Sequence, residues 1–313
     1  MSAPEVAYVA VAVNDVAAVS RVFTGALGLA HRIGSLEDGT EVPLFTVGRT
    51  AMAVFEVGHA FLGAESKPGV HHLAIAAPDP AAYAKAVDVP AVAGASSAGI
   101  DGARQIVLDR DATCGVRLRV SQPMTLAPGD SRCAERIDHL GVAASDNARA
   151  GAVFTAKLGC PVESTQTDME VQMAVESFTS DKYGVVYHSR PPQPAGGLRV
   201  SFLTAGDFEL EFLQPFDPAP EKADPSGPAP NQPGNTRGDR GAIGRYLYRR
   251  GPGFHHVALK TPDIDELLAE LAQEGLRMID VKGRPGSRRA LIGFVHPASL
   301  GGLLLHFVER DEP

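Results

Sequence analysis

The chain has 313 residues, which suits two domains of ordinary size, and its 44% hydrophobic and 21% charged residues are typical of a globular protein. A formal net charge of −8 and the lack of a basic cluster exclude nucleic acid as an expected partner. No apolar run approaches the ~18 residues of a membrane helix, and the N-terminus lacks the basic start of a signal peptide. Three cysteines without a CxxC pair fit a reducing compartment, so we expect a cytoplasmic protein.

The first half of the chain predicts two units that each begin with a strand and a helix. Residues 6–29 (VAYVAVAVNDVAAVSRVFTGALGL) begin with a strand of alternating apolar residues and continue as an alanine-rich helix that ends near Leu27 and Gly28. Residues 68–80 (PGVHHLAIAAPDP) predict another strand and a turn, and the helical segment AAYAKAV follows. Further strands are predicted near 103–122.

The second half repeats both segments. Residues 137–160 (IDHLGVAASDNARAGAVFTAKLGC) match 6–29 at a constant offset, and residues 252–264 (PGFHHVALKTPDI) match 68–80. A hairpin is predicted over 198–215 and strands over 289–310. The chain therefore predicts four units, each a strand, a helix and about three strands, which start near Val6, Val70, Ile137 and Phe254.

These repeats divide the chain into an N-terminal domain (1–124), a linker (125–136) and a C-terminal domain (137–313). Within the C-terminal domain, residues 216–241 are rich in Pro, Gly, Asp and Asn and have almost nothing to bury. We expect a long mobile loop there, which is either a functional lid or a disordered segment.

Four βαβββ units arranged as two pairs resemble the vicinal oxygen chelate superfamily, which includes glyoxalase I, extradiol dioxygenases, bleomycin-resistance proteins and methylmalonyl-CoA epimerase. The segments IDHLGVA (137–143), ELEFLQP (209–215) and GFHHVAL (253–259) are most similar to the epimerase branch. The resemblance implies an α+β fold of two tandem glyoxalase-like domains, in which paired units form a cleft with a divalent metal at its floor.

The resemblance places the metal ligands on the first and last strands of each unit, at His139, Glu211, His256 and His306. Strand periodicity agrees, because His139 shares a face with Gly141 and Ala143, whose small side chains leave room for an imidazole. Three imidazoles and a carboxylate suit zinc, iron or cobalt, with nickel or manganese as alternatives, and do not suit calcium or magnesium.

The N-terminal half has a different set of residues at the matching positions, which are Tyr8, about Ala53, His72 and Arg119. Only one of these is a ligand type, so we expect this half to keep the fold without the metal, which resembles the two-domain extradiol dioxygenases. We expect His72 and its neighbour His71 to be structural and Arg119 to lie at a surface or interface.

Other residues near the predicted site have weaker signals. Neighbours on a strand face opposite sides, so we expect His255 to point away from His256. The basic segment KGRPGSRR (282–289) predicts a solvated loop, with contact to a substrate phosphate or carboxylate as the alternative.

The ligand set and the resemblance imply a reaction. A divalent metal polarises a carbonyl and stabilises an enolate, and removal of the α-proton then needs a base. The candidates are His306, if it does not bind the metal, and Glu209, which shares a strand face with Glu211. Lys260, on the face of His256, is a candidate partner for a substrate anion.

Three functions follow as hypotheses. The first is a metal-dependent epimerase, isomerase or lyase that acts through a metal-stabilised enolate on a small molecule with adjacent oxygens, as a monomer or homodimer. The second is an Fe(II)-dependent dioxygenase, because two histidines and Glu211 form a facial triad. The third is a non-catalytic small-molecule-binding protein similar to the resistance proteins of the superfamily.

Overall fold

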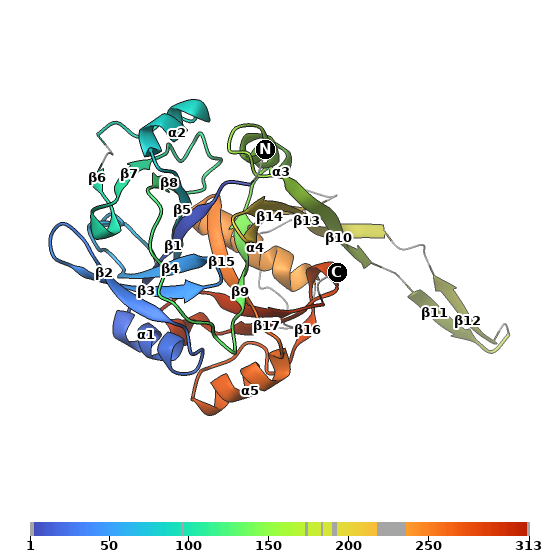
Figure 1. Cartoon of the computed structure of the whole chain (residues 1–313). Helices are drawn as coiled ribbons and strands as arrows, with labels where there is room; N and C mark the ends of the chain where they lie inside the picture. Colours follow the sequence, from blue (N-terminus) through green and yellow to red (C-terminus); the bar gives the residue numbers. More distant parts are fainter. Residues whose placement is uncertain are drawn as a thin grey trace.

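The computed structural model describes residues 3–94, 97–172, 175–182, 184–189, 193–217 and 236–311. Two eight-stranded sheets, each with helices on its outer side, make up the body of the protein (Figure 1). Of the predicted loop 216–241, residues 218–235 lie outside the described residues, whereas residues 236–241 begin a helix. No helix within the described residues is long and apolar enough to cross a bilayer.

The first sheet contains the first two repeat units and has the strand order β2-β3-β4-β1-β5-β8-β7-β6. Unit one consists of β1 (Val6–Val13), α1 (Val16–Thr24), β2 (His31–Ser35), β3 (Glu41–Val47) and β4 (Thr50–Glu56). Unit two consists of β5 (Gly69–Ala76), α2 (Pro80–Ala86), β6 (Ser97–Ala98), β7 (Arg104–Val107) and β8 (Leu118–Ser121). The first strands of the two units, β1 and β5, pair antiparallel at the centre of the sheet.

The second sheet repeats this arrangement in the order β10-β13-β14-β9-β15-β18-β17-β16. Unit three consists of β9 (Arg136–Ala143), α3 (Asn147–Ala156), β10 (Val162–Gln172), β13 (Gln193–Ala205) and β14 (Phe208–Phe216). Unit four consists of β15 (Gly253–Lys260), α5 (Ile264–Gln273), β16 (Arg284–Pro285), β17 (Leu291–Val295) and β18 (Leu305–Glu309). The predicted fold class, four βαβββ units in two tandem domains, is confirmed. The boundaries 1–124, 125–136 and 137–313 are retained as a proposal.

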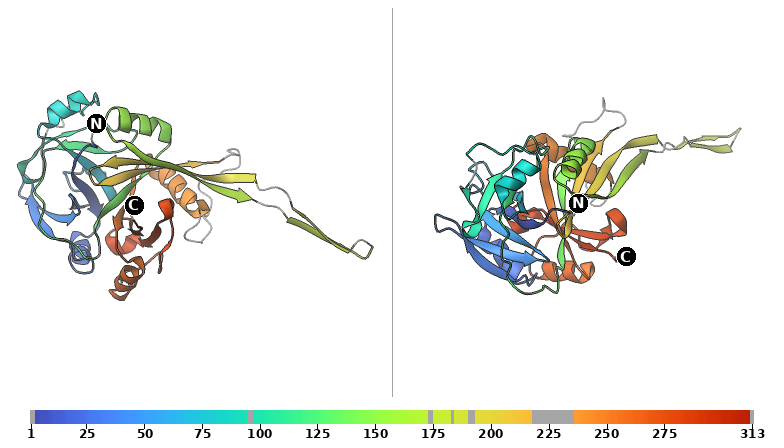
Figure 2. Two further views of the ribbon diagram at one scale, coloured as in Figure 1. Left: turned by 45° about the vertical axis from the view of Figure 1, so that its right-hand side comes forward. Right: turned by 45° about the horizontal axis from the view of Figure 1, so that its top comes forward.

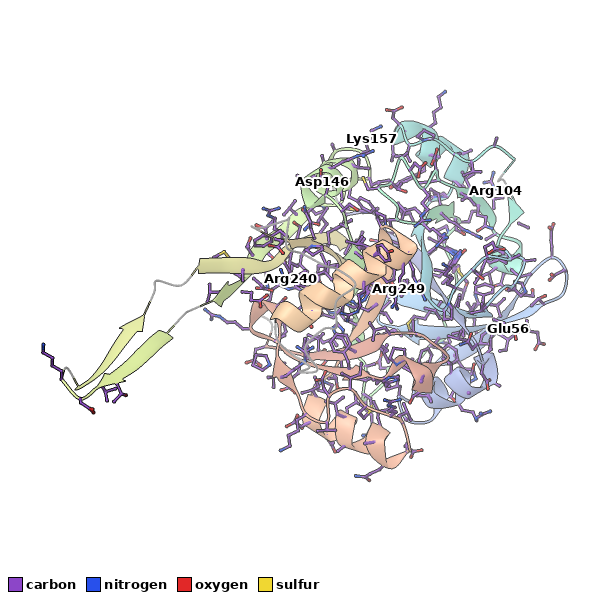
Figure 3. All side chains as sticks on the ribbon, turned by 180° about the vertical axis from the view of Figure 1, so that it is seen from behind. Glu56, Arg104, Asp146, Lys157, Arg240 and Arg249 are labelled. Carbon is purple, nitrogen blue, oxygen red and sulfur yellow. The ribbon has the colours of Figure 1, made fainter. Side chains whose placement is uncertain are left out.

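A hairpin is inserted within unit three, and a helix lies between unit three and unit four. The hairpin of β11 (Val175–Ser180) and β12 (Gly184–Ser189) projects away from the body (Figures 1 and 2). Helix α4 (Thr236–Arg250) crosses the second half, with Arg240 near one end and Arg249 near the other (Figure 3). Ile243 and Leu247 pack on β13 and β14, and this contact favours a helix where composition predicted a loop.

An aspartate caps the helix of every unit, which explains why each helix begins directly after the first strand. Asp15 accepts a hydrogen bond from the backbone N–H of Ala18, Asp79 from Ala81 and Ala82, Asp146 from Arg149, and Asp263 from Glu266. The glycines predicted to end the first helix of each half, Gly28 and Gly159, have φ values of +58° and +75°. They lie a few residues beyond the helix ends, in the left-handed conformation that favours glycine.

One hydrophobic core joins the two halves. It contains apolar residues from β1 and β5 of the first sheet and from β9, β15 and β18 of the second. The backbones also approach closely near Gly115, whose φ is +89° and where a Cβ would lie 2.7 Å from a side-chain carbon of Pro252. This core covers one face of each sheet, and α4 lies against the opposite face of the second sheet, where the cavity forms.

Candidate metal centre

The strand register places the four predicted ligands in two neighbouring rows across the second sheet. In one row, His139 on β9 lies opposite Ala258 on β15, which lies opposite His306 on β18. In the next row, Gly141 lies between Glu211 on β14 and His256 on β15. Because side chains two residues apart share a face of a strand, the four polar groups point to the same concave side.

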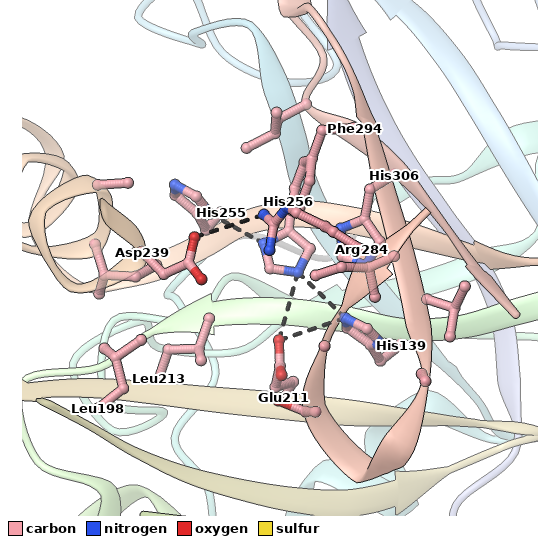
Figure 4. A pocket seen from close by; sticks show the side chains of 18 of the residues that line it. His139, Leu198, Glu211, Leu213, Asp239, His255, His256, Arg284, Phe294 and His306 are labelled. Atoms are coloured by element: carbon pink, nitrogen blue, oxygen red, sulfur yellow. Dashed lines mark hydrogen bonds and ion pairs between the residues drawn. The ribbon is translucent and has the colours of Figure 1, made fainter. Parts of the chain in front are cut away.

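His139, Glu211 and His256 point toward one another, and the His306 ring lies beside the two other imidazoles (Figure 4). The Nε2 atoms of His139 and His256 are 3.3 Å apart, and each lies 3.4 Å from Oε2 of Glu211. One nitrogen from each of His139, His256 and His306 lies within 4.8 Å of the others, and all three rings are buried. Two nitrogens bound to a tetrahedral zinc at ~2.0–2.1 Å would be ~3.3 Å apart.

His306 provides an independent test of whether a cation fits. Both of its ring nitrogens are buried, and neither has a hydrogen-bond partner in the described part of the chain. A buried polar group without a partner costs about 1–3 kcal/mol. A cation at the centre of the cluster would give this imidazole the partner that it lacks, so the residues present fit a divalent metal.

The charge states of three of the four groups, Glu211, His256 and His306, also suit a cation. Burial would raise the pKa of Glu211, but the nearby His139 and His256 outweigh burial and lower it, so the carboxylate is ionised. Burial lowers the pKa of His256 and holds that of His306 well below its usual value. Burial also acts to lower the pKa of His139, but Glu211 and Asp138 outweigh it and raise it.

Asp138 is a residue of the site that sequence analysis missed. Its Oδ1 lies 2.7 Å from Nδ1 of His139, and its Oδ2 lies 2.7 Å from a guanidinium nitrogen of Arg310. Burial raises the pKa of Asp138, but the bond to His139 and the nearby charges of His139, Arg310 and Arg288 lower it to about 2. Such a carboxylate orients the ring and directs Nε2 towards a metal, and the dipeptide Asp-His was the available signal.

The prediction that His255 points away from His256 is wrong. Their Nδ1 atoms are 3.0 Å apart, and His255 lines the cavity. The register shifts between Phe254 and His256, so His255 is the extra residue of a β-bulge. A bulge interrupts the alternation of side chains on which the prediction rested.

Gly141 makes room for His256. A Cβ added at Gly141 would collide with three ring atoms of His256, so any larger residue would displace the imidazole. Gly141, one of the small residues expected beside the ligands, is therefore required to accommodate the His256 ring.

The cluster lies in a cavity of about 920 Å³. Strands β10, β13, β14, β17 and β18 line it together with α4. Arg284 and Arg288, from the basic segment 282–289, also line it, so the prediction of a solvated loop is wrong for these two residues. Arg288 stacks over Phe202 at 3.8 Å and lies 3.5 Å from carboxylate oxygens of Asp138 and Glu209.

Glu209 and Lys260 are not among the residues that line the cavity. Glu209 faces Arg288, and burial raises the pKa of its carboxyl. Lys260 lies 3.2 Å from Glu135, at the far end of β15 from the cluster. Four residues along a strand span ~13 Å, which explains why a shared face did not bring Lys260 to His256.

The same strand positions of the first half contain a different polar cluster. His72 Nε2 lies 3.2 Å from the Tyr8 hydroxyl, which donates to Gln105 at 3.3 Å. Arg119, expected at a surface, is only 8% exposed and donates to the Phe61 carbonyl at 2.6 Å. Ala53 provides no ligand.

Comparison with known proteins identifies relatives of the second half. Residues 138–294 match the family model of the Glyoxalase/Bleomycin resistance protein/Dioxygenase superfamily. A mitochondrial methylmalonyl-CoA epimerase of Dictyostelium discoideum is 32% identical over 136 residues, which are 42% of this chain and 69% of the relative. The human mitochondrial methylmalonyl-CoA epimerase is 22% identical over 186 residues, 59% of this chain and 80% of the relative.

One solved structure matches both halves together. A mutant 4-hydroxymandelate synthase from Streptomyces coelicolor has a TM-score of 0.62 and 14% sequence identity, and the match covers 99% of this chain and 94% of that one. At this identity the likeness concerns the fold, and it covers the tandem arrangement of the two halves.

Proposed function

This chain belongs to the glyoxalase/bleomycin resistance protein/dioxygenase superfamily, and from that premise we propose that its second half is a divalent-metal-dependent epimerase or isomerase. The proposed ligands are His139, Glu211, His256 and His306. The observation that carries the proposal is the buried His306 ring, whose nitrogens have no hydrogen-bond partner among the described residues and which faces two other imidazoles.

A divalent metal bound there would supply Lewis-acid stabilisation of the negative charge on an enolised carbonyl. The chain must supply the rest, which is a proton-transfer group and a means to orient the substrate. Asp239 on α4 lines the same cavity, and its carboxylate lies 3.7 Å from Arg284. Burial, only partly offset by Arg284, raises the pKa of Asp239, which is the direction expected for a group that accepts and returns a proton.

The cavity also favours an anionic substrate. Arg245 and Arg277 line it, and no carboxylate within the described residues forms an ion pair with either side chain. A carboxylate or phosphate group on the substrate would pair with them while adjacent oxygens face the metal centre. The matched epimerases are named for methylmalonyl-CoA, so this compound belongs in the test panel as one acyl thioester among other α-acidic carbonyl compounds.

The test combines metal content with proton exchange. Protein purified without added metal should contain about one zinc, cobalt or iron per chain, and His256→Ala should lose it. The matched control is His72→Ala, the same change at the equivalent position of the first half. With substrate in deuterated water, the wild-type chain should introduce deuterium at the α-carbon, and Asp239→Asn should slow this exchange at least tenfold while keeping the metal. A metal-free wild-type protein would refute the proposal.

An Fe(II)-dependent dioxygenase is the second candidate, and one observation favours it. His139, His256 and Glu211 form a triangle with sides of 3.3, 3.4 and 3.4 Å, the ligand set of a facial triad. Iron in the purified protein, with oxygen uptake on 2-oxo acids or catechols and no deuterium exchange, would favour this reaction over enolisation.

A further inference from the structure

A second cavity, of about 260 Å³, lies where the two halves meet and has no part in the proposed reaction. The first half contributes Lys67, Arg110 and Arg117, and the second half contributes Tyr246 and Arg250. Arg250 ends α4, whose C-terminal end reaches the first half near the labelled Arg249 (Figure 3). Four cationic side chains therefore surround a small space, with Glu65 as the single carboxylate among its lining residues.

Two of these cations each donate to a backbone carbonyl of the opposite half. Arg110 donates from Nη2 to the Pro252 carbonyl at 2.7 Å and from Nε to the Gly115 carbonyl at 2.7 Å. Arg250 donates from Nη1 to the Pro68 carbonyl at 2.8 Å. Carbonyl oxygens orient a guanidinium but do not neutralise it, so both charges persist at the cavity.

Acidic partners for these cations are lacking. Within the described ranges, no carboxylate lies within 4.0 Å of Lys67, Arg110, Arg117 or Arg250, although the chain has a net charge of −8. Elsewhere arginines such as Arg288 and Arg310 do pair with carboxylates. Burial and the neighbouring charge of Arg110 lower the pKa of Arg117, which agrees with mutual repulsion around the cavity.

We infer that this junction cavity, defined by Lys67, Arg110, Arg117 and Arg250, binds a small multiply charged anion of the phosphate type. Guanidinium groups bind phosphate and carboxylate oxygens in pairs, and several cations around one space favour a dianion over a monoanion. The volume is below the ~300 Å³ at which pockets for drug-sized ligands begin, so the bound group is small. Because its ligands come from both halves, the anion stabilises their contact.

The test uses the full chain with inorganic phosphate and succinate as probes, in buffers of equal ionic strength. Phosphate should raise the melting temperature and bind measurably by calorimetry, whereas acetate, a monoanion, should do neither. Succinate separates a general dianion site, which it would also occupy, from a site selective for phosphate. The variant R117Q/R250Q should weaken phosphate binding at least tenfold.

The matched control is R49Q/R132Q, which removes two arginine charges from surface ion pairs outside both cavities and should retain phosphate-dependent stabilisation. K67Q/R117Q changes two exposed residues of one half and provides a second variant if the first folds poorly. Equal losses in R117Q/R250Q and R49Q/R132Q would overturn the inference, as would the absence of phosphate binding at millimolar concentration. Metal content does not enter these measurements, so their failure is distinct from failure of the proposed function.

Discussion

The two halves of this protein share one topology but have different residues at the four equivalent strand positions. Register aligns Tyr8 with His139, Ala53 with Glu211, His72 with His256 and Arg119 with His306. In the first half the Tyr8 hydroxyl bonds to His72 and Gln105, whereas in the second half the ring nitrogens of His306 have no hydrogen-bond partner among the described residues. The scaffold therefore fixes where polar groups meet, and the residue types decide whether they need a ligand.

The first half fills its concave face. Arg119 donates to the Phe61 carbonyl and stacks over the Phe61 ring at 4.2 Å, which holds the segment after β4 against the sheet. Leu44, Phe55 and Leu62 pack in the same layer. At the equivalent face of the second half lies the cavity of about 920 Å³.

One feature is common to both halves and so belongs to the scaffold. The register shifts at His71 as it does at His255, and in each half the Nδ1 atoms of the paired histidines approach, at 2.8 Å and 3.0 Å. The bulge and the histidine pair thus exist without a ligand set beside them. A His-His motif alone does not identify the half for which we propose a metal site.

The largest expected effect that separates the halves is that of Gly141→Ala. The new Cβ would displace the His256 ring, so metal affinity should fall more than ~100-fold, beyond the 10–100-fold cost of changing an outer residue of a metal site. Titration of the stripped protein with zinc in competition with a chelator measures this. Ala10→Gly, at the equivalent position of the first half, should leave metal affinity unchanged, and a similar loss there would contradict the assignment.

Asp138→Asn should weaken metal binding about 10–100-fold, because the carboxylate that orients His139 is lost. The same chelator competition measures it. A variant with wild-type affinity would show that His139 does not depend on this contact.

Arg119→Met should act on stability and not on the metal. Loss of the bonds to Phe61 and Gln105 should reduce the free energy of unfolding by roughly 1–3 kcal/mol. Urea denaturation measures the loss and metal analysis provides the control. A change in metal content would mean that the first half contributes to the metal centre.

The smallest effect expected is that of His255→Ala, a reduction in metal affinity of about tenfold or less, since Asp138 and Gly141 still position the other groups. His71→Ala is the matched control at the equivalent bulge and should have no effect on affinity. If His255→Ala abolished binding, His255 would have to be counted with the ligands.

Sequence by itself determined the repeats, the fold class and the four positions that converge. Strand periodicity and duplicated segments are local signals, and they persist because each unit folds on the same pattern. The family resemblance then assigned His139, Glu211, His256 and His306 to one place.

Only the tertiary structure decided which other polar residues lie beside these four side chains. Asp138 reaches His139, a bulge turns His255 to the cavity, and Arg288 folds over Phe202, whereas Lys260 pairs with Glu135. Helix α4 depends on packing against β13 and β14 that its glycine-rich sequence does not reveal. The physical reason is the same in each case: bulges and contacts between distant strands override the local alternation from which a sequence is interpreted.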